Sequence, residues 1–214
     1  MIQNGTLMKV DRRRILETAL EVLNEVGVDA LSTRAIAERL GVRQPALYWH
    51  FKSKRDLLDA MNGEILGRAH EARVPRPGET WQDFVRRNGR SFRAALLNYR
   101  DGARVHAGTE ADPDGLTHVE AQVAFLVAAG FTPGQAMQLF VAVSRYVVGC
   151  VLEEQASSAD GSVEQSQLDE AARAYPVLSE AVAYYRTSGH AGLFERGLEL
   201  MVKGAEAELA TARG

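Results

Sequence analysis

Apolar residues recur at helical spacing through almost the whole chain of 214 residues. Near the N-terminus, for example, Ile15, Ala19, Val22, Leu23 and Val26 would share one face of a helix. The alternation of apolar and polar residues that marks half-buried strands is scarce. We therefore predict an all-α protein.

Glycines, prolines and capping residues indicate where the helices begin and end. We expect helices over about residues 11–26, 33–40, 44–50, 54–73, 80–99, 116–129, 133–155, 168–187 and 190–210. The rest is expected as a flexible tail (1–10), a turn-rich segment (101–115) and a flexible, solvated loop (about 156–167).

The composition of the chain excludes several kinds of site and favours a cytoplasmic nucleic-acid binder. The single cysteine, Cys150, excludes an internal disulfide and a cysteine-rich zinc site. No signal peptide begins the sequence, and no uninterrupted apolar run is long enough to span a membrane, so we expect a cytoplasmic protein. Residues 1–55 carry ten Lys and Arg against six Asp and Glu, whereas the whole chain has a net charge of −3. A basic N-terminal part on an acidic body is typical of a modular nucleic-acid binder.

The two short helices at 33–40 and 44–50, joined by a glycine turn, form a helix-turn-helix pattern. We predict a three-helix DNA-binding domain over residues 11–57 and a helical ligand-binding and dimerisation domain over 58–214. An αα-hairpin without a role in DNA binding would give the same pattern, so this alternative stays open.

The second helix of the pattern would place its first residues on base edges in the major groove. Arg43 can pair with guanine, Gln44 with adenine, and the methyl of Ala46 can pack on a thymine methyl. Leu47 and Phe51 lie four residues apart and would face the core.

Three adjacent residues of this helix, Tyr48, Trp49 and His50, cannot all be buried, because neighbours on a helix point in different directions. Each can donate a hydrogen bond to phosphate at the rim of the groove. Half-burial of Tyr48 in the core is the simpler alternative. Three further residues could add phosphate contacts from helix starts, namely Thr33, Arg34 and Lys54.

Polar residues interrupt two apolar stripes in the C-terminal part. Asn88 lies one turn before Phe92, and Gln122 lies between Val119 and Val123. A buried amide without a partner costs about 1–3 kcal/mol. The two amides therefore indicate either a polar cavity for a ligand or hydrogen bonds to nearby backbone, and the pattern alone does not choose.

The segment 139–152 is apolar almost all round, so it predicts either a central core helix or a dimer interface. Single histidines such as His70 and His106 are more often structural than ligands, and Glu153 by itself reads as a solvated carboxylate.

The stretch "LSTRAIAERLGVRQPALYWHFKSKRDLLDAM" resembles the DNA-binding domain of the tetracycline repressor family. The resemblance implies a homodimeric repressor of transcription that a small molecule releases from double-stranded operator DNA. It assigns base contacts to Arg34, Gln44, Pro45 and Tyr48, and phosphate contacts to Thr33, Trp49, His50 and Lys54. Arg43 and Ala46 depart from the acidic residue and the threonine common in tetracycline repressors, so we expect these two positions to decide which operator the protein reads.

The resemblance continues in "YRDGA-VH-GT" and "GCVLE-Q". It implies that His70, Asn88, Phe92 and Gln122 contact a tetracycline-like drug. It also implies that His106 binds a Mg²⁺ ion delivered with the drug. Thr109, together with Glu153 of the partner subunit, would hold the water ligands of this ion. No cofactor is expected without the drug. Glu110 and Ala111 replace an Arg-Pro pair of the family, in the turn whose rearrangement triggers release in the family.

We expect binding at His106 to shift the segment 101–112, which would push the end of the helix 54–73 and separate the recognition helices. One alternative is the same repressor with a non-chelating polyketide or another hydrophobic ligand; another is a ligand carrier that has lost DNA binding. An enzyme with His106 and Glu153 as acid and base is disfavoured, because no nucleophile or cofactor loop accompanies them.

Overall fold

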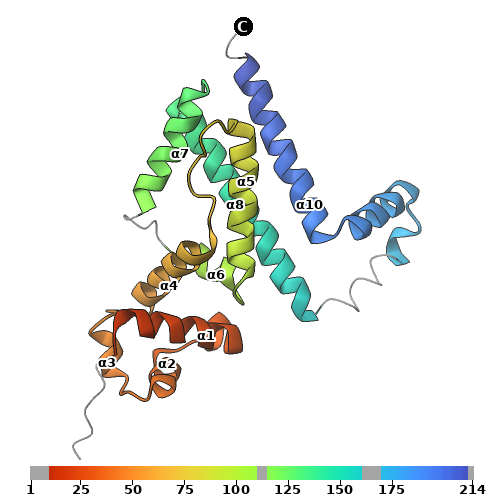
Figure 1. The fold of residues 1–214 in the computed structure, drawn as a ribbon. Coiled ribbons are helices and arrows are strands. Elements are labelled where there is room, and N and C mark those ends of the chain that lie inside the picture. Colours follow the sequence, from red (N-terminus) through yellow and green to blue (C-terminus); the bar gives the residue numbers. More distant parts are fainter. Residues whose placement is uncertain (1–9, 110–114, 161–169, 212–214) are drawn as a thin grey trace, which may run out of the picture. The chain divides into compact units, whose positions relative to one another are not determined.

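The computed structural model of the chain describes residues 10–109, 115–160 and 170–211. Every regular element in these ranges is a helix, so the predicted all-α class is confirmed (Figure 1). The helices form two compact units, which we describe separately. Unit 1 comprises Met1–Glu71 and Ala94–Asp114, and unit 2 comprises Ala72–Arg93 and Gly115–Gly214.

Unit 1 contains the expected helix-turn-helix. Its helices are α1 (Arg12–Ala30), α2 (Thr33–Leu40), α3 (Pro45–Tyr48), α4 (Lys54–Ala69), the end of α5 (Trp81–Leu97) and α6 (Gly102–Ala107). The side chains of Asp11, Ser32 and Ser53 each accept a hydrogen bond from a backbone N–H in the first turn of α1, α2 and α4. Gly41 ends α2 with a left-handed φ of 68°. These caps confirm the expected starts of α1, α2 and α4 and the expected end of α2. The expected end of α1 near residue 26 is wrong, because the helix continues past a non-helical Gly27 to Ala30, and α3 is shorter than the expected 44–50.

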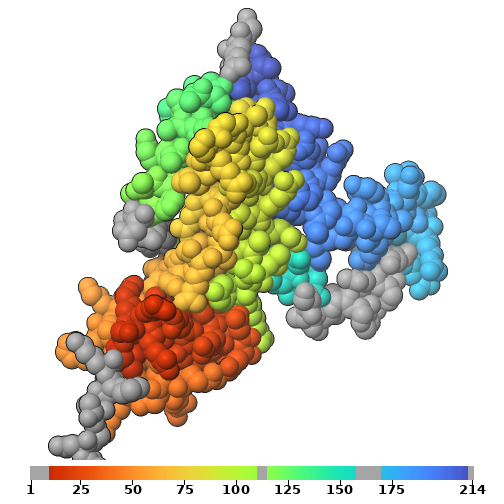
Figure 2. All heavy atoms as spheres, viewed as in Figure 1, coloured from red at the N-terminus to blue at the C-terminus, as the bar shows by residue number. Residues whose placement is uncertain are grey.

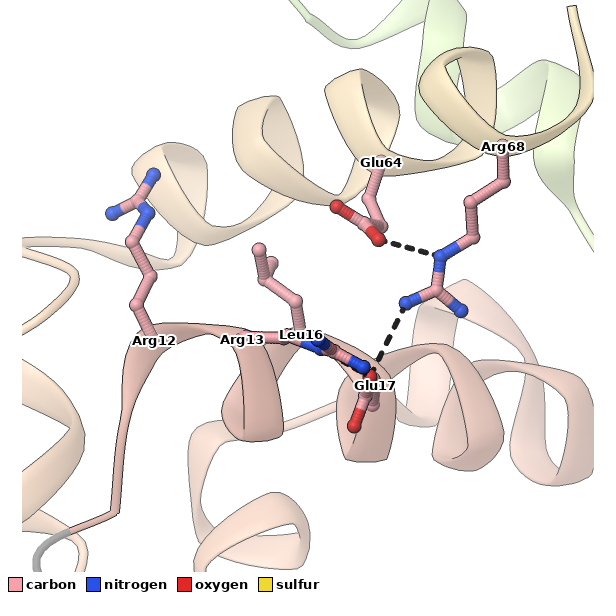
Figure 3. A pocket seen from close by; sticks show the side chains of 6 residues that line it. All are labelled: Arg12, Arg13, Leu16, Glu17, Glu64 and Arg68. Atoms are coloured by element: carbon pink, nitrogen blue, oxygen red, sulfur yellow. Dashed lines mark hydrogen bonds and ion pairs between the residues drawn. The ribbon is translucent and has the colours of Figure 1, made fainter.

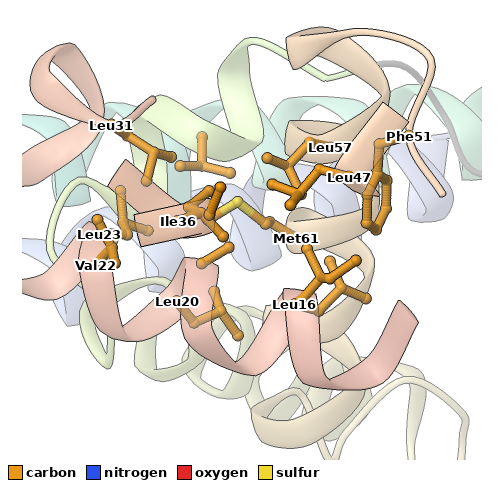
Figure 4. Close-up of a cluster of buried hydrophobic side chains, with 14 of the residues drawn as sticks. Leu16, Leu20, Val22, Leu23, Leu31, Ile36, Leu47, Phe51, Leu57 and Met61 are labelled. Carbon is orange, nitrogen blue, oxygen red and sulfur yellow. The ribbon is translucent and has the colours of Figure 1, made fainter. Parts of the chain in front are cut away.

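One hydrophobic core holds these helices together (Figure 4). Leu23 of α1, Ile36 of α2, Leu47 of α3 and Met61 of α4 are each at most 1% exposed. Val105 of α6 belongs to the same cluster. The short helix α6 is thus part of the core that supports the helix-turn-helix.

A groove between α1 and α4 is lined by charged side chains that pair with each other (Figure 3). Arg68 of α4 lies 2.5 Å from Glu64 on its own helix and 3.7 Å from Glu17 on α1. Leu16 is nearly buried at the floor of the groove. These contacts add charged pairs to the apolar packing of α4 on α1.

Unit 2 contains the first part of α5 together with α7 (Leu116–Ala128), α8 (Pro133–Asp160) and α10 (Pro176–Thr211). Phe84 of α5 makes edge contacts with Phe125 of α7 and Phe140 of α8. Helix α8 packs on α10, where the Tyr146 hydroxyl lies 3.0 Å from the carbonyl oxygens of Leu193 and Phe194. Aromatic side chains therefore supply much of this core.

Several expected helix boundaries are wrong. Residues Gly102–Ala107 form a helix inside the expected turn-rich segment, and α4 ends at Ala69 rather than near residue 73. Helix α8 extends to Asp160, into the expected loop, and the rest of that loop lies outside the described residues. The last two expected helices form one element, α10, which begins only at Pro176 and has a kink at Gly189. The expected tail 1–10 lies outside the described residues except for its last residue.

Helix α8 is apolar, as expected, but only one side of it is buried. Val143, Val147 and Val151 are at most 2% exposed, whereas Met137 and Val141 are exposed. Within the described ranges, α8 is the one helix long and apolar enough to cross a membrane by length and composition, a property that core helices of soluble proteins share. The first part of α10 also exposes apolar side chains, among them Val177 and Tyr184. This segment is coloured light blue in Figure 2 and lies at the surface in that view.

We expect Gly102→Ala to destabilise the protein, because a Cβ there would lie 2.2 Å from the carbonyl oxygen of Leu96. The free energy of unfolding should fall by about 1–3 kcal/mol. Gly67→Ala, on the exposed side of α4 with nothing within 4 Å of the added Cβ, is the matched control and should raise it by about 0.5–1 kcal/mol. Urea unfolding measures both, and equal changes would contradict the close approach at Gly102.

Candidate functional site

The surface of α2 and α3 carries the side chains predicted to contact DNA. Leu47 and Phe51 are buried, as expected, at 1% and 2% exposure. Tyr48 is 50% and Trp49 89% exposed. These two large aromatic side chains therefore cover no core of unit 1, which leaves them available to a partner.

Gln44 joins the two helices of this surface. Its Nε2 donates to Thr33 Oγ1 on α2 at 2.8 Å and lies 3.4 Å from the Tyr48 hydroxyl. Arg43 beside it is exposed and Ala46 is half-buried. The Gln44 side chain is thus oriented before any contact with a base.

Basic residues surround this surface. Lys54 is exposed at the start of α4, directly after the capping Ser53. Arg34 lies 2.9 Å from Glu38 on α2, and this hydrogen bond raises the pKa of Arg34. The backbone carbonyl of His50 accepts a hydrogen bond from Arg12, whose guanidinium also lies over the Phe51 ring. The end of α3 is therefore tied to α1.

Helix α6 is bound to α1 by charged and polar contacts within unit 1. Arg104 makes two hydrogen bonds of 2.8 Å to the carboxylate of Asp29. Asp101, which precedes α6 with a left-handed φ of 57°, accepts the backbone N–H of Val28 at 2.8 Å. A displacement of α6 would break contacts made by the last residues of α1.

His106 on α6 was predicted to hold a metal. Its Nδ1 lies 3.0 Å from Oδ1 of Asn62 on α4, and its backbone carbonyl accepts the Thr109 hydroxyl at 2.8 Å. Burial lowers the pKa of His106, so the imidazole is neutral at pH 7. A neutral imidazole that donates a hydrogen bond from one nitrogen has a lone pair on the other, and that form can bind a divalent cation.

Sequence reasoning missed Asn62, although a signal existed. Asn62 lies four residues after Leu58 and three before Ile65, on an apolar side of α4. Asn88 and Gln122 were found by that kind of interruption. Asn62 is 7% exposed in the structure.

Asn88 and Gln122 both reach the segment that begins unit 2. Asn88 Nδ2 donates to the carbonyl of Ala72 at 2.9 Å, and Gln122 Nε2 donates to the carbonyl of Arg73 at 2.7 Å. The pattern had left two readings open, and the structure supports the one with backbone hydrogen bonds. The described residues give no donor to either amide oxygen, so both oxygens can still accept.

An ion pair holds this segment against α5. Arg87 donates to both carboxylate oxygens of Glu79 at 2.6 Å and to the carbonyl of Val74. The hydrogen bond from Arg87 holds the pKa of Glu79 below its usual value. The carbonyls that Asn88 and Gln122 contact thus belong to a segment that Arg87 holds against α5.

The remaining predicted ligand-site residues lie in both units. His70 follows the end of α4 in unit 1, and Thr109 is half-buried after α6. Phe92 is buried on α5 in unit 2, whereas Glu153 is exposed on α8. Glu110 and Ala111 lie outside the described residues. Among the described side chains, no group of three His, Cys, Asp or Glu could hold a metal ion by itself.

Comparison with known families matches both parts of the chain. Residues 15–61 match the family described as "Bacterial regulatory proteins, tetR family", and residues 74–209 match "Tetracyclin repressor-like, C-terminal domain". Together they cover most of the chain, including the helix-turn-helix and helices α5 to α10.

Individual relatives support the same family. The tetracycline repressor protein class A from transposon 1721 of Escherichia coli is 45% identical over 203 residues, which cover 92% of this chain and 91% of that protein. The structure of TetR (class A) with 5a,6-anhydrotetracycline and magnesium is 41% identical, with a TM-score of 0.74 over 92% of this chain and 99% of that one. ActR of Streptomyces coelicolor in complex with actinorhodin is 28% identical, with a TM-score of 0.82 over 94% of this chain and 98% of that one.

These matches confirm the resemblance read from the sequence and exclude the enzyme with His106 and Glu153 as acid and base. The chain belongs to the tetR family of bacterial regulatory proteins, as a DNA-binding regulator of transcription with a tetracycline-repressor-like C-terminal domain.

Proposed function

We propose that this protein is a homodimeric repressor that a tetracycline-like compound, bound as its magnesium chelate, releases from operator DNA. The main support for this proposal is the position of His106 in the structure. Its neutral imidazole lies on α6, and α6 is hydrogen-bonded to α1 and α4 within the unit that contains the helix-turn-helix. DNA binding is assigned to residues 11–57, and ligand binding and dimerisation to 58–214.

On the DNA side, α3 enters the major groove with its N-terminal residues against the bases. Arg34, Arg43, Gln44, Pro45, Ala46 and Tyr48 form the proposed base-contacting set. Phosphate contacts are proposed for four residues around the same surface, namely Thr33, Trp49, His50 and Lys54. The exposed side chain of Trp49 favours this role. Gln44, already held by Thr33, needs little rearrangement to read a base.

On the ligand side, Asn88 and Gln122 accept hydrogen bonds from the hydroxyl groups of a polycyclic ligand through their amide oxygens. His70 adds a polar contact, and Phe92 packs on an apolar ring. When bound, Mg²⁺ would supply a hard positive charge for an oxygen-rich ligand edge, held by His106 directly and through water by Thr109 and Glu153 of the partner subunit. The relative solved with 5a,6-anhydrotetracycline and magnesium supports this ligand class.

Release requires the ligand to favour the conformation that does not bind DNA. A ligand held by His106 moves α6, and Arg104 and Asp101 carry that movement to the end of α1. The shared core of Val105 and Met61 carries it to α4. The recognition helices of a dimer then no longer match two half-sites about 34–36 Å apart.

The exposed apolar residues of α8 and α10 supply the proposed dimer interface. Met137 and Val141 on α8 and Leu200 on α10 are 43%, 37% and 59% exposed. A monomer would leave this apolar surface in water, whereas pairing with a second copy buries it. We place the protein in the cytoplasm, where its operator DNA lies.

Base and phosphate contacts should respond differently to mutation. Arg43→Ala should weaken binding by about 1–3 kcal/mol only for operators with guanine at one position. Trp49→Ala should weaken binding to all sequences alike. Fluorescence anisotropy with an operator library measures both effects, and Arg76→Ala in unit 2 controls for the loss of one positive charge. An equal loss on all operators for Arg43→Ala would refute its role at a base.

Tetracycline with magnesium should release labelled operator DNA from the wild-type protein. Titration of the complex with tetracycline, with and without Mg²⁺, measures the release. Release that does not need Mg²⁺ would support the alternative of a non-chelating ligand, which the likeness to ActR with actinorhodin favours. Failure of any polycyclic polyketide to release the operator would refute induction, and failure of the protein to bind DNA at all would point to a ligand carrier.

His106→Ala should separate the two functions. We expect the magnesium-dependent affinity for tetracycline to fall more than about tenfold, because the variant lacks the ligating nitrogen. The affinity for operator DNA without drug should stay unchanged. An equal loss of both affinities would mean that His106 serves the fold rather than the ligand.

A further inference from the structure

Asn62 makes one directional contact with His106. It lies on α4, is 7% exposed, and places its Oδ1 3.0 Å from Nδ1 of the imidazole. Helices α4 and α6 pack against each other inside unit 1, so this pair is held by the core that supports the DNA-binding helices. Neither family match nor the resemblance assigns a role to this residue.

The chemistry of the pair fixes the position of a proton. A neutral imidazole has one N–H donor and one nitrogen with a lone pair. An amide oxygen only accepts, so contact with Oδ1 requires the proton on Nδ1 and leaves the lone pair on Nε2.

We propose that Asn62 is a positioning residue: it holds His106 in the Nδ1–H tautomer, so that Nε2 is the nitrogen that binds the cation of a chelating ligand. This rests on the proposed function for the identity of the ligand, but the tautomer itself is a property of the protein without drug. Hydrogen bonds that a metal-binding histidine donates to an outer residue orient the ring and increase the metal affinity. Because Asn62 lies on α4, the same contact joins the cation site to the helix that follows the helix-turn-helix.

The tautomer can be measured in the full-length protein without ligand. Long-range ¹H–¹⁵N correlation spectra of protein labelled at histidine distinguish a protonated Nδ1 from a protonated Nε2, and His106→Ala assigns the signals. We expect the Nδ1–H form in the wild type. Asn62→Leu, of similar size but without an acceptor, should lose this preference, whereas Asn62→Asp keeps the acceptor and should retain it at a pH where the ring is neutral.

The opposite orientation of the Asn62 amide would donate Nδ2–H to Nδ1 and place the proton on Nε2. An Nε2–H signal in the wild type would therefore overturn the proposal, as would an unchanged tautomer in Asn62→Leu. Asn98→Leu, at an exposed position of unit 1, is the matched control and should leave the His106 signals unchanged.

Affinity for the magnesium complex of tetracycline gives a second measurement. Asn62→Leu should weaken binding by about 10–100-fold, and Asn62→Asp should recover most of it. Wild-type affinity in Asn62→Leu would contradict the positioning role. If the wild type does not bind this complex at all, the proposed function fails, and the tautomer measurement still decides the role of Asn62.

Discussion

The short helix α6 is fixed by hydrogen bonds along its length, and the coupling between ligand and DNA depends on this attachment. Asp101 holds the start of α6 to Val28, and Arg104 holds its middle to Asp29. His106 holds its end to Asn62. The helix has only six residues, too few to be stable alone, so its position is set by these contacts and by the burial of Val105.

The sequence predicted those parts of the fold that depend on local chemistry. Ser32, Ser53 and Gly41 set helix ends by hydrogen bonds and backbone conformation within a few residues, and all three ends lie where expected. Helix α6 escaped prediction because its stability comes from residues far away in the chain. Its start needs Gly102 to approach the backbone of Leu96 and Asp101 to adopt a left-handed conformation, and neither is visible in a helical pattern.

In the candidate site, too, the sequence predicted features that depend on local residues and missed those that depend on distant ones. A polar residue on an apolar stripe located Asn88 and Gln122, but not the carbonyls of Ala72 and Arg73 that they bind, because partners across a fold leave no local signal. Asn62 carried a similar signal. Tyr48 and Trp49 were correctly read as outward-facing, since three adjacent bulky residues cannot share one buried face.

The central claim, that ligand and operator bind competing conformations linked through α6, is tested by reciprocity. Thermodynamic linkage requires that if the drug weakens operator binding by some factor, the operator weakens drug binding by the same factor. The fluorescence of tetracycline with Mg²⁺, titrated with the protein in the presence and absence of saturating operator DNA, measures that factor directly. We predict a weaker drug affinity on the operator, by the factor found in the release titration. An affinity that operator DNA leaves unchanged would contradict the account.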